Sequence, residues 1–316
     1  MELQIDHLTV YDYTPAVETA QHRVHLRPLE TMHQAVHGHA LNITPHPGFC
    51  RSSLDAFGNT QTHFSLAVPH TRLEVAAQSR VVTRAPQALP DNSLNHPVWT
   101  TVPARFAYHK GMTYDPACEF SFASPHVPHH ADFLAYASPS FEADTPVLQG
   151  VIDLMQRMHQ DFTYASQSTE VNTPARVALA QRKGVCQDFA HIMLACLRSL
   201  GLSAQYVSGY LLTHPPEGQP RLIGSDASHA WVSVYVPDLA PENPSACWCD
   251  FDPTNNRWGW GTPGEDYVTL ARGRDFADVS PLRGVIHGGS HHRLSVAVTV
   301  WPVTEGSPLE SSATGS

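Results

Sequence analysis

The sequence predicts an α+β protein in which an all-β region precedes a region of helices packed on an antiparallel sheet. Three observations lead to this prediction. Residues 1–125 contain short apolar runs separated by Pro, Gly, Asn and Asp, a pattern typical of β-sandwiches and small barrels. From residue 144 the apolar residues recur at helical spacing. After Gly201 the period changes to that of strands.

Residues 1–125 are predicted to form a β-rich N-terminal domain. The segment Asp55–Asn59 contains a Gly-Asn pair and is expected to form a hairpin turn. No pattern in this region indicates chemistry, so its acidic residues and histidines are interpreted as a solvated surface. The apolar runs that we expect to form strands are Leu8–Tyr11, Val24–Leu26, Ala40–Ile43, His63–Val68 and Leu73–Val82.

Composition and charge restrict the class of protein. The chain has 316 residues, enough for one large or two ordinary domains, and 42% of them are hydrophobic. A formal net charge of -10 argues against nucleic acid or an anionic membrane surface as a partner. No apolar window reaches transmembrane length, and the acidic start Met1–Asp6 does not resemble a signal peptide. We therefore expect a cytoplasmic protein whose six cysteines are free thiols.

The second region is predicted to run from residue 144 to 303 and to start with two helices. An apolar stripe after Pro146, the expected first helical residue, predicts the first helix, and a shorter helix is expected to end near Arg182. Residues 126–143 are interpreted as a Pro- and His-rich linker, and residues 304–316 as a disordered tail.

A cysteine in the first turn of a third helix is the most informative feature of the chain. Gly184 precedes this helix and Gly201 follows it as the expected C-cap. Unpaired backbone N–H groups and the positive end of the helix dipole favour a thiolate at Cys186. The alternative is a small buried apolar residue, as expected for Cys196. The apolar face consists of Phe189, Ile192, Met193, Cys196, Leu197 and Leu200.

A histidine and an aspartate are expected to meet on two neighbouring strands. The run from His229 to Val236 alternates cleanly between two faces, and a second strand ends at Asp252. Two successive strands with a short connection usually pair antiparallel, so the start of the first lies beside the end of the second. Asp250 and Asp252 have the same parity, but Asp252 is favoured because it is nearer the strand end.

These three residue types form the set that thiol-based acyl transfer requires. An imidazole takes the thiol proton and later protonates the leaving amine. A carboxylate on the other ring nitrogen fixes the tautomer and stabilises the imidazolium. We therefore predict Cys186 as nucleophile, His229 as acid and base, and Asp252 as the residue that orients it.

Other combinations of residues give weaker predictions. The histidines between residues 126 and 130, with His287, His291 and His292, do not match the ligand spacing of a zinc site, and we predict no metal and no cofactor. The pair Cys247 and Cys249 lies on a strand without the helix-start geometry of a redox motif, so packing is the preferred interpretation.

Four segments resemble the core of the transglutaminase-like superfamily, in particular its bacterial branch described as cysteine proteases. The resemblance covers roughly residues 145–260, and a weaker one covers the β-rich region before it. It implies a papain-like α+β fold with the catalytic cysteine on a helix packed against an antiparallel sheet. The segments are Gly184–His191, Ala204–Leu212, Ser228–Val232 and Phe251–Asn255, and Gly273–Gly284 also resembles a recurrent segment of that branch.

By motif position, the resemblance assigns nucleophile, base and orienting residue to Cys186, His229 and Asp252. Supporting residues are less defined. Tyr164 is a candidate oxyanion donor beside the backbone N–H of Cys186, or a core residue. Asp188 is expected to interact with the helix dipole or anchor a hydrogen bond. Trp231 either shields the histidine and aspartate from water or packs in the core.

The expected activity is that of a cysteine peptidase or amidase acting on a peptide or glutaminyl carboxamide through a thioester. The alternatives are a transglutaminase that uses an amine acceptor and a non-catalytic binding module. In animal transglutaminases Gly-Gln-Cys-Trp surrounds the cysteine, whereas here the surrounding sequence is Gly-Val-Cys-Gln (184–187). No calcium loop is present in the sequence, so calcium activation is not expected.

Overall fold

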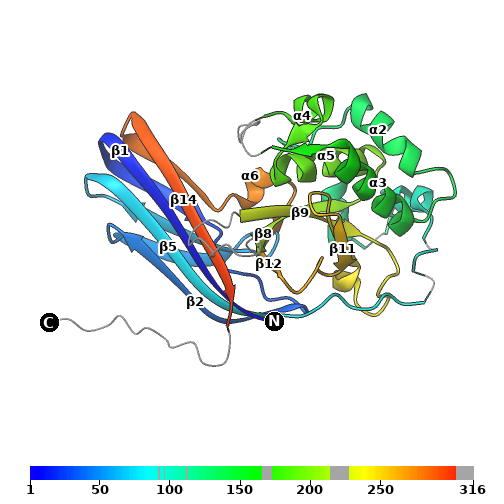
Figure 1. Ribbon diagram of the computed structural model, residues 1–316, viewed down its shortest axis with the longest axis horizontal. Coiled ribbons are helices and arrows are strands. Elements are labelled where there is room, and N and C mark those ends of the chain that lie inside the picture. The colour runs from blue at the N-terminus through cyan, green and yellow to red at the C-terminus, as the bar shows by residue number, and fades with distance from the viewer. Residues whose placement is uncertain (92, 96, 112, 166–172, 214–227, 304–316) are drawn as a thin grey trace, which may run out of the picture.

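The computed structural model describes residues 1–303 apart from 92, 96, 112, 166–172 and 214–227. The described residues form a seven-stranded sheet, a five-stranded sheet, a two-stranded ladder and several helices. Figure 1 shows the large sheet at one end of the molecule and the helices, with the five-stranded sheet, at the other. The predicted α+β class is therefore confirmed. The tail predicted for residues 304–316 lies outside the described residues.

The seven-stranded sheet is organised around one long strand, β1 (Glu2–Val24). Its first half pairs with β5 (His70–Thr83) and β14 (His291–Pro302), and its second half pairs with β4 (Thr60–Leu66) and β13 (Leu282–Gly288). β2 (Gln34–Thr44) pairs with β5, and β3 (Phe49–Leu54) pairs with β4. Buried apolar residues of β1, β4 and β5 pack in one cluster. One strand, β1, contains both Leu8–Tyr11 and Val24, which the sequence predicts in two separate strands.

The hairpin turn predicted at Asp55–Asn59 is confirmed between β3 and β4. The Asp55 carboxylate accepts hydrogen bonds from the backbone N–H groups of Phe57 and Asn59, both at 2.8 Å. These bonds replace the strand ladder at the turn, as expected for an aspartate in this position.

The last two strands of the chain belong to the first sheet. β13 and β14 are both antiparallel partners of β1, and Val298 and Val300 pack with Leu3 and Ile5 in the main core. The prediction that the second region extends to residue 303 is therefore wrong. Local apolar alternation predicts that a strand exists, but its partner is set by contacts that span nearly the whole chain.

The segment predicted as a linker at residues 126–143 is packed into the core. It contains α2 (Ala131–Ala137), and Val127 and Phe133 are fully buried. The Arg157 guanidinium donates to Oγ of Ser140 at 2.7 Å and to the carbonyl oxygen of Tyr136 at 3.1 Å. Its Pro- and His-rich composition is typical of linkers, but these contacts fix it, so the linker prediction is wrong.

Residues 84–125, predicted as part of the β-rich region, contain no strand of either sheet in the described part. Instead they form η1 (Trp99–Thr101), α1 (Val102–Arg105) and η2 (Pro116–Ser121). Val102 and Phe120 from this segment join the main core. It therefore belongs by its packing to the helical side of the molecule.

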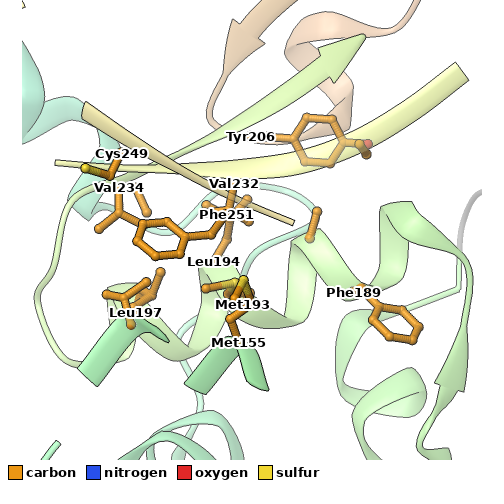
Figure 2. Close-up of a cluster of buried hydrophobic side chains, with 14 of the residues drawn as sticks. Met155, Phe189, Met193, Leu194, Leu197, Tyr206, Val232, Val234, Cys249 and Phe251 are labelled. Carbon is orange, nitrogen blue, oxygen red and sulfur yellow. The ribbon is translucent and has the colours of Figure 1, made fainter. Parts of the chain in front are cut away.

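The five-stranded sheet has the order β11-β10-β9-β8-β12, and each pair of neighbouring strands is antiparallel. Its strands are β8 (Ala204–Leu211), β9 (Ser228–Tyr235), β10 (Trp248–Asp252), β11 (Arg257–Trp260) and β12 (Tyr267–Gly273). One face packs against α5 (Cys186–Ser199), and α3 (Val147–Asp161) lies behind it. Figure 2 shows Met193, Leu194 and Leu197 of α5 near Val232 and Phe251 of the sheet.

The remaining elements are short. They are η3 (Ser138–Ser140), β6 (Thr163–Tyr164), α4 (Ala175–Gln181), β7 (Lys183–Gly184), η4 (Pro244–Ala246) and α6 (Phe276–Val279). Pro146 is the N-cap of α3 and not its first residue, and no side chain caps that end. Within the described residues, no helix combines the length and apolar character needed to cross a bilayer.

Candidate active site

Cys186 is the first residue of α5, as the sequence predicts. The Asp188 carboxylate accepts a hydrogen bond from the backbone N–H of Val185 at 2.8 Å, which fixes the entry to the helix. A Cβ on Gly184 would lie 2.6 Å from Cβ of Asp188, so only glycine allows this close approach. Gly184 is not left-handed; the left-handed residue at this entry is Arg182, with φ 54°. Asp188 therefore anchors the turn that carries Cys186, as a hydrogen-bond anchor, one of the two roles expected for it.

His229 and Asp252 meet in the way predicted from strand pairing. β9 and β10 are antiparallel neighbours, and Nε2 of His229 lies 2.6 Å from Oδ2 of Asp252. Asp250, the other aspartate that the sequence allows as a partner of His229, interacts with different residues. It accepts from Nε1 of Trp231 at 3.0 Å and from Oγ of Ser233 at 2.5 Å. The structure thus separates the two aspartates, with Asp252 on the histidine.

Hydrogen-bond donors surround the Asp252 carboxylate. Besides His229, Oδ2 accepts from the Tyr267 hydroxyl and from Nδ2 of Asn255, both at 2.7 Å. Oδ1 accepts from the backbone N–H of Thr254 at 2.9 Å. Asp252 is fully buried. These bonds hold the carboxylate in one orientation and satisfy it in its charged form.

Sequence reasoning did not identify Tyr267 or Asn255 as part of the site. Asn255 stands within the Phe251–Asn255 segment that carries the family resemblance, which was the available signal. Tyr267 reaches the site from β12, at the far side of the sheet order from β10, so no local pattern indicates it. Its contact depends on a crossover that sequence spacing does not encode.

The pair of His229 and Asp252 is stable as an ion pair. Burial disfavours a charged imidazole, but the Asp252 carboxylate and the Cys186 side chain outweigh it and raise the pKa of His229 to about 10. Burial alone would raise the pKa of Asp252, yet His229, Asn255 and Tyr267 lower it below its ordinary value. Because Nε2 faces Asp252, Nδ1 is the nitrogen left for the thiol. Cys186 contributes less than Asp252 to the raised pKa of His229.

Tyr164 and Trp231 lie near the site in different environments. Tyr164 pairs with Gly184 in the short β6–β7 ladder and is 53% exposed, so it is not a core residue. Burial, and secondarily the charge of Cys186, raise the pKa of Tyr164, so its hydroxyl keeps its proton at neutral pH. Trp231 is fully buried, with its ring centroid 6.1 Å from that of His229. It packs in the sheet and covers one side of the imidazole.

The histidines and cysteines outside the site have structural surroundings. The rings of His126 and His191 stack at 5.2 Å, and Nδ1 of His287 lies 3.0 Å from Oε2 of Glu18. In the part of the chain that the structure describes, no group of three or more His, Cys, Asp or Glu is arranged to hold a metal ion. Cys247 and Cys249 are buried, and burial raises the pKa of both thiols.

Comparison with known proteins agrees with this architecture. Residues 3–82 match the bacterial transglutaminase-like N-terminal region, and residues 135–253 match the transglutaminase-like superfamily core. The uncharacterized protein Rv2569c of Mycobacterium tuberculosis is 38% identical over 98% of this chain and 95% of its own length. The uncharacterized protein ML0607 of Mycobacterium leprae is 28% identical over 94% of this chain and 98% of its own.

A solved structure has the same fold at low sequence identity. It is described as "a Putative Cysteine Protease from Cytophaga hutchinsonii" and covers 96% of this chain and 91% of its own, with a TM-score of 0.72 and 19% identity. The family matches and the relatives that span nearly the full length lead to one conclusion. The chain belongs to the transglutaminase-like superfamily.

Proposed function

We propose that this protein is a thiol-dependent acyl-transfer enzyme that acts on peptide or glutaminyl carboxamide bonds through a Cys186-thioester, in the manner of a cysteine peptidase or amidase. One observation carries the proposal: a buried, fully hydrogen-bonded carboxylate holds the His229 imidazole, whose pKa is raised by Asp252 and by the Cys186 side chain. The superfamily fold and the cysteine-protease description of the structural neighbour are consistent with it.

The acylation step uses the ion pair that the site stabilises. Sγ of Cys186 attacks the carbonyl carbon as the thiolate, and His229 is protonated at this stage. When the tetrahedral intermediate collapses, the C–N bond breaks and His229 gives its proton to the leaving amine. Asp252 holds the imidazole in the required orientation and stabilises its positive charge before that transfer.

The thioester is then cleaved by a second nucleophile. His229, now neutral, removes a proton from water or from a primary amine, which attacks the thioester carbonyl. The C–S bond breaks and the thiolate–imidazolium pair is restored. Water gives a hydrolase and an amine gives a transglutaminase, so the same residues support both outcomes.

Two donors near Cys186 suit the oxyanion that forms in each step. As the first residue of α5, Cys186 has a backbone N–H without a partner inside the helix. The Tyr164 hydroxyl, placed by the β6–β7 ladder, is the second donor in this proposal. Loss of one oxyanion donor typically reduces turnover by about 10² to 10³-fold.

The test is to trap the acyl-enzyme. The protein is mixed with blocked glutaminyl peptides or unblocked peptides, quenched in acid and examined by peptide mass spectrometry. We expect an acyl adduct on Cys186, and Cys186→Ala should lose it and reduce turnover by at least about 10⁴-fold. The matched control is Cys118→Ala, which removes another partly exposed thiol and should leave the adduct unchanged.

Added primary amine separates the two acceptors. Amine incorporation into product would favour the transglutaminase, and loss of the adduct to water alone would favour the peptidase or amidase. An adduct that persists in the Cys186→Ala protein would contradict the proposal. So would the complete absence of an adduct with peptides and with an electrophilic thiol probe, which would favour the non-catalytic binding module.

A further inference from the structure

A cavity far from Cys186 lies between the two sheets. Its volume is about 890 Å³, within the range of ligand sites. It opens at the end of β9 that carries Tyr235, whereas His229 stands near the other end. Six residues of extended strand separate them, about 20 Å. The cavity is therefore separate from the candidate active site.

Four neighbouring strands present side chains to this cavity from one face of the five-stranded sheet. Trp248 of β10 is directly opposite Tyr235 of β9. Gln205 and Val207 lie two residues apart on β8 and therefore share a face of the sheet. Val207 is directly opposite Arg272 of β12. All four of the cavity-lining residues, Trp248, Tyr235, Gln205 and Arg272, thus share a face, the one opposite α5.

The hairpin of the first sheet closes the cavity from the other side. Asn59 clamps the backbone of Arg272, donating from Nδ2 to its carbonyl oxygen at 2.7 Å and accepting from its N–H at 2.8 Å. This brings Phe57 beside Phe120, with ring centroids 5.5 Å apart, and Phe120 lies 5.7 Å from Trp248. The three rings form a continuous aromatic wall.

Two polar side chains of the lining are without partners. Gln205 is 8% exposed, and its Oε1 is buried with no hydrogen bond among the described residues. The buried Nε of Arg272 likewise has no acceptor there. Natural proteins pair most buried polar groups, so such atoms at a cavity wall indicate missing ligand atoms.

The other charged groups of the lining are already paired. Arg274 is bonded to Asp278 at 2.9 Å and lies 3.7 Å from Glu119. Asp115 accepts from the N–H of Ala117 at 2.9 Å and from the Tyr235 hydroxyl at 3.2 Å. Arg272 is thus the lining charge that no carboxylate of the described residues neutralises.

We propose that this cavity binds a small organic carboxylate that carries an aromatic ring and an N–H donor, as an N-acylated aromatic amino acid does. The carboxylate lies against the Arg272 guanidinium, which suits carboxylates geometrically. The N–H donates to Oε1 of Gln205, and the ring packs on Phe57, Phe120 and Trp248. The proposal does not depend on the chemistry assigned to Cys186.

The test compares two probes that differ only at the carboxyl group, N-acetyl-L-tryptophan and its amide, by calorimetry and ligand-observed NMR. We expect the carboxylate to bind at least about tenfold more tightly than the amide. Arg272→Met should abolish that preference. Arg274→Gln changes the paired arginine of the same cavity and should leave it within about twofold. Cys186→Ala should bind both probes as the parent protein does.

Gln205→Leu keeps the shape of the side chain and provides a second readout. It should weaken binding of the carboxylate probe without lowering the melting temperature, because it removes an unpaired buried amide. A Gln205→Leu protein that is markedly destabilised would mean that the amide has a structural partner and would contradict the proposal.

The remaining outcomes are also decisive. An acetylated Ala-Ala-Trp peptide that binds more tightly than N-acetyl-L-tryptophan identifies a peptide chain end as the ligand, and weaker binding identifies a free small molecule; both support a carboxylate site. Equal binding of the acid and the amide, no binding up to about 10 mM, or an unchanged preference in Arg272→Met would overturn it.

Discussion

The two sheets bury histidines with opposite effects on their charge. In the seven-stranded sheet, Nδ1 of His7 lies 2.7 Å from the Tyr210 hydroxyl and Nε2 lies 3.0 Å from Oγ1 of Thr9. Both partners are neutral, and burial lowers the pKa of His7 to about 4. Burial, with the nearby His70, lowers the pKa of His22 to about 4 as well.

In the five-stranded sheet the His229 side chain is only 10% exposed, yet its surroundings favour the charged form. The difference is the ionised carboxylate of Asp252, which together with Cys186 overcomes the cost of burial and raises the pKa of His229 to about 10. A buried histidine therefore loses its charge unless a carboxylate compensates it. The comparison separates structural histidines from a candidate catalytic one more sharply than sequence position does.

The largest expected effect comes from replacing the charged partner of His229 by a neutral one. Asp252→Asn leaves His229 with a neutral partner, like His7, and we expect kcat/KM to fall by about 10³ to 10⁴-fold. The measurement is steady-state kinetics on the substrate identified by acyl-enzyme trapping, with NMR titration of His229 to follow its charge. The pKa of His229 should fall.

Asp250→Asn is the matched control for this variant. Asp250 is equally buried on the same strand, but its bonds go to Trp231 and Ser233. It should cost stability and change kcat/KM by less than about tenfold. Equal losses of activity in the two variants would mean that burial on β10, and not the contact with His229, matters.

A smaller effect is expected in the pH dependence of stability. The unfolded chain binds a proton at His7 near pH 6.5, whereas the native protein does so only near pH 4. The stabilisation from burying neutral His7, about 3 kcal/mol, is thus present above pH 6.5 and lost as the pH falls to 4. Urea unfolding of the parent protein and of His7→Gln at a series of pH values should show a shallower acid slope in the variant.

The effect of His229 on the pH dependence of stability has the opposite sign, because its pKa is raised in the native protein and that of His7 is lowered. Its raised pKa means that its stabilising contribution is complete below pH 6.5 and is lost as the pH rises towards 10. His229→Gln should therefore flatten the alkaline limb and leave the acid limb unchanged. Identical acid slopes for the parent protein and His7→Gln would show that His7 is not buried in its neutral form.

Much of the candidate site could be predicted because its parts are locally encoded. The apolar spacing after Cys186 defines α5, and the alternation from His229 defines β9. A short connection then predicts antiparallel pairing with β10, which brings Asp252 to the histidine. Each step uses a period or a loop length, and these act over a few residues.

The parts that could not be predicted depend on contacts distant in sequence. Tyr267 reaches Asp252 from β12, two strands beyond β9 in the sheet order, and β14 pairs with β1 from the opposite end of the chain. Residues 126–143 have the composition of a linker, but the hydrogen bonds from Arg157 to Tyr136 and Ser140 and the core contacts of Phe133 fix them. The composition of a segment does not predict its packing partners, because these are set by contacts with distant parts of the chain.

The most direct measurement of the central claim is the rate of Cys186 alkylation by iodoacetamide at pH 7, followed by peptide mass spectrometry. Because His229 keeps its proton up to about pH 10, its cationic ring should activate the thiol, and Cys186 should react at least about tenfold faster than the exposed Cys50. A Cys186 that reacts no faster than Cys50 would contradict the account.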